Sequence, residues 1–368
     1  MPELEIVLIA IAVAAACSLV GCFLVLRRMA MLSDAITHTI LLGIVAAFFV
    51  AGDLNSPLLM LGAALMGVVT VYFTETLHKT RLMSEDSAIG IVFPLLFSIA
   101  IVLITRYAGS VHLDTDAVLR GELAFAPYDR LVLGGRDIGP RSLYVMGAAL
   151  ALNLAAVLLF YKELKLSTFD AVTASLMGFM PALLHYLIMT LVSVTAVAAF
   201  DSVGSILVVA FMIGPPSAAY LLTDKLKYML AISCALGAAA AVLGYLAASA
   251  LDVSIAGSIA VMIGLIFAAV FVFSPKKGLI TDMLRKHRQK RRFYEDIMLF
   301  YFYKRKEASP NETPMENARI RLGWKKNFCE KTASRLLGQN KICYDGESVK
   351  LTESGKEYCI ETYKEYFG

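Results

Sequence analysis

A carboxylate and an imidazole lie four residues apart in the otherwise apolar stretch SDAITHTILLG, which runs from Ser33 to Gly43. On a helix, residues i and i+4 share one face, with their Cβ atoms about 5–6 Å apart, so Asp34 and His38 could hold one ion between them. This pair of donors suits Mn²⁺, Fe²⁺ or Zn²⁺ and lacks the soft thiolate that favours Cu(I). The alternative is that Ser33 or Asp34 caps a helix N-terminus and that His38 is a hydrogen-bonded core histidine.

The composition indicates what kind of helix would carry this pair. Of the 368 residues, 58% are hydrophobic and 17% are charged, whereas ordinary soluble domains carry about 25% charged residues. A helix needs about 20 apolar residues to cross a hydrocarbon core of about 30 Å. Eight segments approach or reach this length, and a ninth, 35–50, is interrupted by His38; the eight are 7–26, 58–73, 89–105, 143–161, 182–200, 206–222, 229–251 and 255–273.

The sequence therefore predicts an all-α polytopic membrane protein, with eight or nine transmembrane helices in residues 1–275. An ionisable side chain inside a membrane is costly and is by default a functional candidate. This context favours metal binding by Asp34 and His38 over the capping alternative. The membrane context also makes His185, early in another apolar segment, a candidate residue that could support the metal ligands or gate the translocation path. A hydrogen-bonded core histidine is the simpler interpretation of His185.

The composition changes abruptly after Ser274. Residues 276–368 carry 21 Lys and Arg against 13 Asp and Glu, whereas the preceding residues carry 13 and 17. We divide the chain into a transmembrane domain (1–275), a basic juxtamembrane linker (276–292) and a small domain (293–368). The linker holds eight basic residues and one acid, and each basic residue near an anionic membrane surface contributes about 1 kcal/mol. Membrane lipids are therefore a predicted partner of the linker.

The loops indicate the orientation in the membrane. Five basic pairs fall after alternate crossings if nine helices start from an outside N-terminus: Arg27/Arg28, Lys79/Arg81, Lys162/Lys165, Lys225/Lys227 and Lys276/Lys277. Positively charged loops face the cytoplasm, so the C-terminal domain is predicted to be cytoplasmic. The segment 107–141 disagrees, because it would lie outside and carries four arginines, and the sequence does not fix its position.

No stretch of the sequence has the G-x-x-x-x-G-K-[ST] pattern of a phosphate-binding loop. We therefore expect no ATPase site and no enzymatic activity in this chain, so any use of ATP would require another subunit. The connector KLSTFDAVTASLMGFMP, 165–181, lies between two crossings on the predicted cytoplasmic side. Asp170, Ala174 and Gly178 recur every four residues, which would line them along one helical face, and a small residue lets a partner approach closely. An amphipathic connector without a partner would show the same spacing.

Four stretches together resemble the permease subunits of the ATP-binding-cassette importers for manganese, zinc and iron. They are LRRMAMLSDAITHTILLGIVAAF, SEDSAIGIVFPLLFSIAIVL, FDAVTASLMGF and AFDSVGSILVVAFMIGPPSAAYLLT. They occur in the order found in that family, and the resemblance covers about residues 5–275. The chain departs from the family at Gly214-Pro215-Pro216, where Thr-Pro-Ala is usual, and in its long tail.

This resemblance implies that 170–179 is a coupling helix that docks into a separate ATPase subunit, and that Asp34 and His38 contact metal in the translocation path. It also implies a second permease chain, an extracytoplasmic protein that delivers the metal, and a location in a bacterial inner membrane. The metal would be transported cargo, and no permanently bound cofactor is expected.

The small domain 293–368 has a helix–turn–helix–turn–helix pattern, then a hairpin over 341–351 with an Asp345-Gly346 turn, and a final helix. This order is similar to the winged-helix part of metal-responsive repressors, whose L-T-x-x-G motif resembles Leu351–Gly355. A small cytoplasmic α+β winged-helix-like domain is therefore expected. Its 13 basic and 12 acidic residues nearly cancel, and DNA affinity depends on phosphate neutralisation. We expect a regulatory or assembly module, with DNA an unlikely partner.

Three functions remain open at the level of the sequence. The first is the membrane subunit of an importer of divalent manganese, zinc or iron, powered by a separate ATPase. The second is an importer for an organic metal chelate of the siderophore or cobalamin type, for which a wide, aromatic-rich cavity would be expected. The third is a secondary transporter, which would need no ATPase. Because an aspartate and a histidine bind all three metals, the pair does not select among them.

Overall fold

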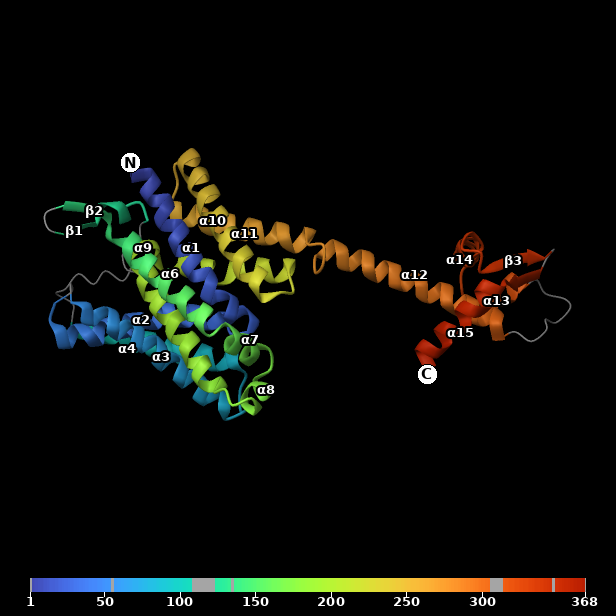
Figure 1. Cartoon of the computed structure of the whole chain (residues 1–368), viewed down its shortest axis with the longest axis horizontal. Coiled ribbons are helices and arrows are strands. Elements are labelled where there is room, and N and C mark those ends of the chain that lie inside the picture. Colours follow the sequence, from blue (N-terminus) through green and yellow to red (C-terminus); the bar gives the residue numbers. More distant parts are fainter. Residues whose placement is uncertain are drawn as a thin grey trace. The chain divides into compact units, whose positions relative to one another are not determined.

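The computed structural model describes residues 2–53, 56–107, 123–133, 136–304, 314–345 and 348–367. The chain forms two compact units, Met1–Leu279 and Ile280–Gly368 (Figure 1). The elements of the first unit are α1 (Pro2–Leu26), α2 (Ala30–Ala51), α3 (Pro57–Lys79), α4 (Glu85–Tyr107), η1 (Ala126–Tyr128), β1 (Arg130–Leu133), β2 (Arg136–Pro140), α6 (Arg141–Leu159), α7 (Tyr161–Phe169), α8 (Ala171–Leu176), α9 (Pro181–Leu222), α10 (Leu226–Leu251) and α11 (Ile255–Phe273).

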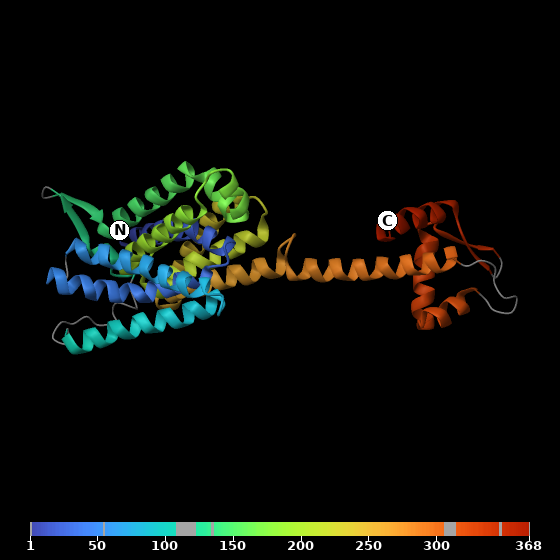
Figure 2. The same ribbon diagram turned by 90° about the horizontal axis from the view of Figure 1, so that it is seen from below.

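Across the described ranges, eight helices are long and apolar enough to cross a membrane: α1, α2, α3, α4, α6, α9, α10 and α11. The prediction of a mostly helical polytopic membrane protein is confirmed. Within the bundle, α1 packs against α6, α9 and α10, while α2 packs against α3, α4 and α9 (Figure 2). The spans α1 and α9 are the most buried, so these two helices form the centre of the bundle.

The 42-residue helix α9 contains two crossings, because the chain reverses within it. Gly204 interrupts the helix with φ 76° and ψ 167°, a conformation that favours glycine. Arg27 contacts His185 near the start of α9, and Gly21 packs against Met212 near its end. In a straight helix His185 and Met212 would be about 40 Å apart, yet both lie beside the last turns of α1. The eight helices therefore contain nine apolar crossings, which matches the segments read from the sequence.

Several glycines let the helices approach closely, as small residues do in membrane proteins. A Cβ at Gly43 of α2 would lie 2.4 Å from the carbonyl oxygen of Gly62 on α3, and one at Gly214 would lie 2.2 Å from the Ile263 side chain of α11. The unusual Gly214-Pro215-Pro216 stretch stays inside α9. Its glycine is explained by this packing against α11.

We predict that Gly21→Ala destabilises the bundle by about 1–3 kcal/mol, the usual cost of overpacking. A Cβ there would lie 2.1 Å from the backbone carbonyl oxygen of Met212, and backbone cannot move aside as a flexible side chain can. A thermal melt of the purified protein in detergent measures the effect. The matched control is Gly147→Ala on α6, where a Cβ would have no neighbour within 4 Å. Equal melting temperatures for both variants would contradict this packing.

The connection between α4 and α6 is described only from residue 123 onward. Its described part forms the short helix η1 and the antiparallel hairpin β1–β2, with an irregular register between Leu131 and Val132. Arg130 forms an ion pair with Glu5 at 3.0 Å, so the hairpin lies beside the N-terminal end of α1. Residues 108–122 of the loop whose position the sequence left open lie outside the described residues.

The second unit contains α12 (Leu279–Lys304), α13 (Pro314–Leu322), α14 (Lys326–Gly338), β3 (Ile342–Asp345), β4 (Ser348–Leu351) and α15 (Glu353–Phe367). The antiparallel pairing of β3 with β4 places Ile342 opposite Leu351. Its core includes Leu299, Leu336 and Cys359. The order of helices, hairpin and final helix is the one expected from the sequence, although the turn residues 346–347 lie outside the described residues. Residues 279–292 of the expected linker belong to α12.

Candidate metal site and coupling segment

The first turns of α2 show that the helix-capping interpretation of the SDAITH stretch is wrong. The helix begins at Ala30, and the residue that precedes it, Met29, makes no side-chain cap hydrogen bond. Ser33 is buried, and its hydroxyl donates to the carbonyl oxygen of Ala30 at 2.7 Å. Asp34 follows it inside the helix, and its carboxylate is therefore free of a capping role.

Asp34 and His38 form the pair that their spacing predicts. The Nε2 atom of His38 lies 3.6 Å from Oδ1 of Asp34, and the two side chains are 26% and 42% exposed, respectively. Their neighbours Thr37 and Thr39 are buried. The helix therefore turns a carboxylate and an imidazole to the same accessible stripe, at a separation longer than a hydrogen bond.

The surroundings of His38 also argue against an ordinary core histidine. Its ring lies against two aromatic rings of α4, with centroid distances of 5.2 Å to Phe93 and 5.8 Å to Phe97. The Nδ1 atom is buried without a hydrogen-bond partner among the described residues. An unsatisfied buried polar atom costs about 1–3 kcal/mol, so packing and hydrogen bonding alone do not explain the histidine.

The pair can supply two ligands to a divalent ion. In the described ranges there is no group of three or more His, Cys, Asp and Glu side chains that could hold a metal. An ion at Asp34 and His38 would therefore complete its coordination with water or with groups from another chain. A site with so few protein ligands releases its ion readily, which a transport pathway requires.

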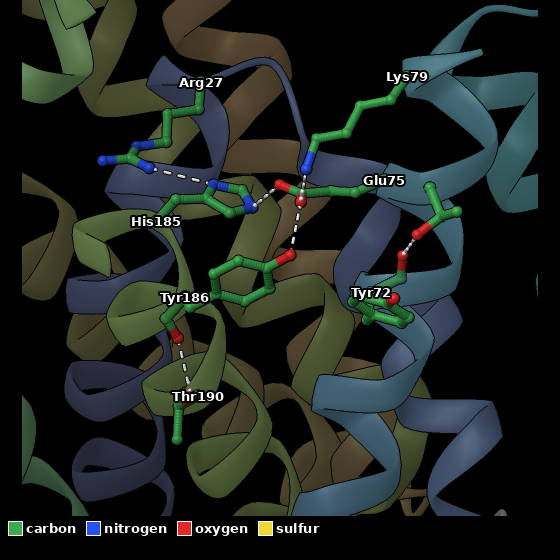
Figure 3. A network of polar contacts seen from close by, with 8 residues as sticks. Arg27, Tyr72, Glu75, Lys79, His185, Tyr186 and Thr190 are labelled. Atoms are coloured by element: carbon green, nitrogen blue, oxygen red, sulfur yellow. Dashed lines mark hydrogen bonds and ion pairs between the residues drawn. The ribbon is translucent and has the colours of Figure 1, made fainter. Parts of the chain in front are cut away.

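His185 lies in a different place from the pair, in a polar network that includes Arg27 and Glu75 (Figure 3). Arg27 contacts Nδ1 of His185 at 3.2 Å, and Glu75 contacts Nε2 at 2.7 Å. Sequence reasoning identified neither Arg27 nor Glu75 as part of a site. Arg27 is the residue after α1, and Glu75 belongs to α3. No local spacing in the sequence therefore relates either residue to His185.

The connector between α6 and α9 folds as two short helices, α7 and α8. Asp170 caps α8 by accepting a hydrogen bond from the Thr173 N–H at 2.9 Å, and the Thr173 hydroxyl donates to the same carboxylate. These bonds, the hydroxyl bond foremost, lower the pKa of the Asp170 carboxyl. They fix the start of α8 without any contribution from a partner.

The prediction that Asp170, Ala174 and Gly178 share one helical face is wrong. The helix spans only Ala171–Leu176, so Asp170 precedes it and Gly178 follows it. Ala174 is buried, and Gly178 has φ 85° with open space around a Cβ. The glycine is therefore required by its backbone conformation and does not share a helical face with Asp170 and Ala174.

Large apolar side chains are exposed on and around α8. Leu176 is 82% exposed and Val172 is 70% exposed, and both belong to α8. Phe169, Met177 and Met180 are also exposed around it. An exposed apolar patch of this kind indicates a protein-interaction site, and we call these five residues the connector patch.

Comparisons with known proteins place this architecture among transport proteins. The model of the ABC 3 transport family matches residues 4–274. The chain is 46% identical over 283 residues to the manganese transport system membrane protein MntD of Bacillus subtilis (strain 168), covering 77% of this chain and 96% of that protein. It is 48% identical over 281 residues to the zinc transport system membrane protein TroD of Treponema pallidum (strain Nichols), covering 76% of each.

A solved structure shows the same fold. PsaBC from Streptococcus pneumoniae in complex with Fab matches with a TM-score of 0.62 and 29% sequence identity, covering 74% of this chain and 92% of that chain. The matched family region ends at residue 274, before the second compact unit begins at Ile280. The family match therefore lies within the first unit.

Proposed function

The chain belongs to the ABC 3 transport family, and we propose that it is the membrane-spanning permease subunit of an ATP-binding-cassette importer of divalent transition-metal ions. The observation that carries this proposal is the accessible Asp34–His38 pair on a transmembrane helix. Its carboxylate and imidazole donors suit manganese, zinc and iron. The names of relatives as manganese and zinc transport proteins support the same class of cargo.

The energy comes from a partner in this proposal. A separate ATPase subunit docks on the connector patch around α8, an extracytoplasmic protein delivers the metal, and a second permease chain completes the translocation path. The protein lies in the cell membrane. Asp34 and His38 hold the ion transiently during its passage, and the ion is cargo that leaves on the cytoplasmic side.

The alternatives fit the geometry less well. An importer of a siderophore or cobalamin would need a wide cavity, whereas the His38 ring packs directly against Phe93 and Phe97 of α4. A secondary transporter would have no use for a large apolar surface on α8 at the end of the bundle. The family match also favours a transporter that works with an ATPase.

Reconstitution tests the proposed function. The permease, its ATPase and the metal-delivering protein are assembled in liposomes, and uptake of radioactive manganese, zinc or iron is measured with and without ATP. We expect uptake that requires both ATP and the ATPase subunit. Uptake of the free ion that proceeds without the ATPase, or uptake of an organic chelate alone, would contradict the proposal.

For the second unit we propose a winged-helix-like module on the cytoplasmic side. The order of its helices and its β3–β4 hairpin supports this fold, and the basic loops support the orientation. Before it, the basic residues of 276–292 would contact anionic lipid headgroups. We propose that the module regulates or assembles the transporter through contacts with the ATPase or with a second permease chain.

We predict that this module does not read DNA. Residues 293–368 carry 13 basic and 12 acidic residues, so little net attraction to phosphates remains. At physiological salt, the fragment 293–368 should bind duplex DNA no better than about 10⁻⁴ M, the weak end of non-specific binding. Fluorescence anisotropy measures the affinity, and a cooperative melt by circular dichroism confirms that the fragment is folded. Sequence-dependent binding in the nanomolar range would show that the module is a DNA reader.

A further inference from the structure

A single guanidinium group connects both flanks of α8. Arg27 donates from Nε to the Thr168 hydroxyl at 3.3 Å and from Nη2 to the Ser167 hydroxyl at 3.1 Å. Both of these acceptors lie at the end of α7, immediately before α8. Its third nitrogen, Nη1, contacts Nδ1 of His185 at 3.2 Å, in the first turns of α9 after α8. All three guanidinium nitrogens of Arg27 therefore contact residues of α7 and α9, the two helices that flank α8.

His185 in turn contacts Glu75 of α3 (Figure 3). A guanidinium has only donors, so Nδ1 of His185 must accept, and the proton of the neutral ring lies on Nε2. That nitrogen lies 2.7 Å from Oε1 of Glu75, a close electrostatic contact that does not have hydrogen-bond geometry. The other oxygen of Glu75 accepts from the Tyr186 hydroxyl at 2.7 Å and from Nζ of Lys79 at 2.9 Å. Two adjacent residues of α9 therefore hold one carboxylate of α3.

The charges of this network exclude a second metal site. Arg27 and Lys79 place two cations against the two residues that could act as ligands, His185 and Glu75. A divalent ion would be repelled by both. The side chains of His185 and Glu75 are only 13% and 20% exposed, and partly buried charges are screened little by solvent. The network therefore joins the residue after α1 to α9 and α3 by direct polar contacts, without a bound ion.

The same arginine is rigidly joined to the helix that carries the metal pair. Only Arg28 and Met29 separate Arg27 from α2. Arg28 has φ 63°, and the Met29 N–H donates to the carbonyl oxygen of Leu24 at 2.9 Å, so the turn is tightly closed. This short turn is the covalent route from Arg27 to the start of α2, where Asp34 and His38 lie.

We infer that Arg27 and Glu75 are positioning residues of the transport cycle, which transmit movement of the α7–α8 connector through His185 to helices α9 and α3 and through the Arg28–Met29 turn to helix α2. The inference rests on the proposed function, in which the ATPase docks at α8. It assigns the network a role in coupling ATP hydrolysis to ion passage.

The test measures metal uptake and ATP hydrolysis together, in the complete complex in liposomes with the metal-loaded delivery protein. For Arg27→Ala and for the milder Glu75→Gln, we expect hydrolysis to persist while metal imported per ATP falls about tenfold, a usual size for coupling between two sites. The matched control is Lys79→Ala. Lys79 contacts the same carboxylate but lies on the same helix and is 71% exposed, so it cannot carry force between helices and its ratio should stay at the wild-type value.

Three results would overturn the inference. They are a wild-type ratio in both network variants, an equal fall in the Lys79→Ala control, or a parallel loss of hydrolysis and uptake with a lower melting temperature, which would show that the network only stabilises the fold. The proposed function is judged separately by the wild-type complex. If that complex shows no ATP-dependent metal uptake, the function itself is wrong, whatever the variants do.

Discussion

Replacing His38 by alanine is expected to abolish metal accumulation while leaving the transporter assembled. The imidazole and the Asp34 carboxylate are the two ligands that the described part of the chain brings together here, 3.6 Å apart. Removing it leaves a single carboxylate, which cannot hold a transition metal against water. The change also removes a buried nitrogen without a hydrogen-bond partner among the described residues, which offsets part of the packing lost against Phe93 and Phe97. Uptake of radioactive manganese or zinc by cells measures the loss.

Two further variants make this result specific. Asp34→Asn keeps the shape of the carboxylate and removes its charge, and we expect the same loss of uptake. His78→Ala removes another histidine, which is exposed at the end of α3 and does not belong to the pair. This variant should leave uptake unchanged. Expression is checked by immunoblot. Normal uptake by the His38→Ala variant would show that the pair does not contact the ion.

The second large effect is expected at the connector patch. Leu176→Glu places a charge on the most exposed large apolar side chain of α8, where an ATPase would bury it. Burying an unpaired carboxylate in an apolar interface is costly, so the ATPase should no longer co-purify with the permease and ATP-driven uptake should stop. The same change in the turn between α3 and α4, Leu82→Glu, is the control, since Leu82 is 85% exposed but lies outside the patch.

Leucine is a better target here than the glycine that the sequence singled out. Any side chain at Gly178 is strained by its φ of 85°, so a bulky variant such as Gly178→Trp would disturb the backbone and the surface together. Leu176→Glu changes the surface alone. A variant that retains a stoichiometric ATPase and full uptake would show that α8 is a connector without a partner.

Local patterns predicted the parts of the protein that depend on local chemistry. Apolar length indicated the crossings, because each helix must cover the same hydrocarbon thickness. The i, i+4 spacing placed Asp34 and His38 on one stripe of α2. Alternation and turn residues predicted the β3–β4 hairpin of the second unit.

Prediction failed where the structure depends on contacts that are distant in sequence or on a single backbone angle. The four-residue spacing from Asp170 to Gly178 suggested one helical face, but α8 ends at Leu176. The network of Arg27, Glu75 and His185 joins residues from three helical regions, and only the packed bundle brings them together. For His185 in particular, the sequence pattern is the same whether the histidine lies beside a metal-binding pair or in a separate polar network.

The most direct measurement of the central proposal is electron–nuclear double resonance on Mn²⁺ bound to the purified permease, with nitrogen-15 in its histidines. If Asp34 and His38 hold the ion, a nitrogen hyperfine coupling from an imidazole should be present in the wild-type protein and absent from the His38→Ala variant. The His78→Ala variant should keep the coupling. A coupling that survives the loss of His38, or that is absent from the wild-type protein with Mn²⁺ bound, would contradict the assignment of this pair as the metal contact in the translocation path.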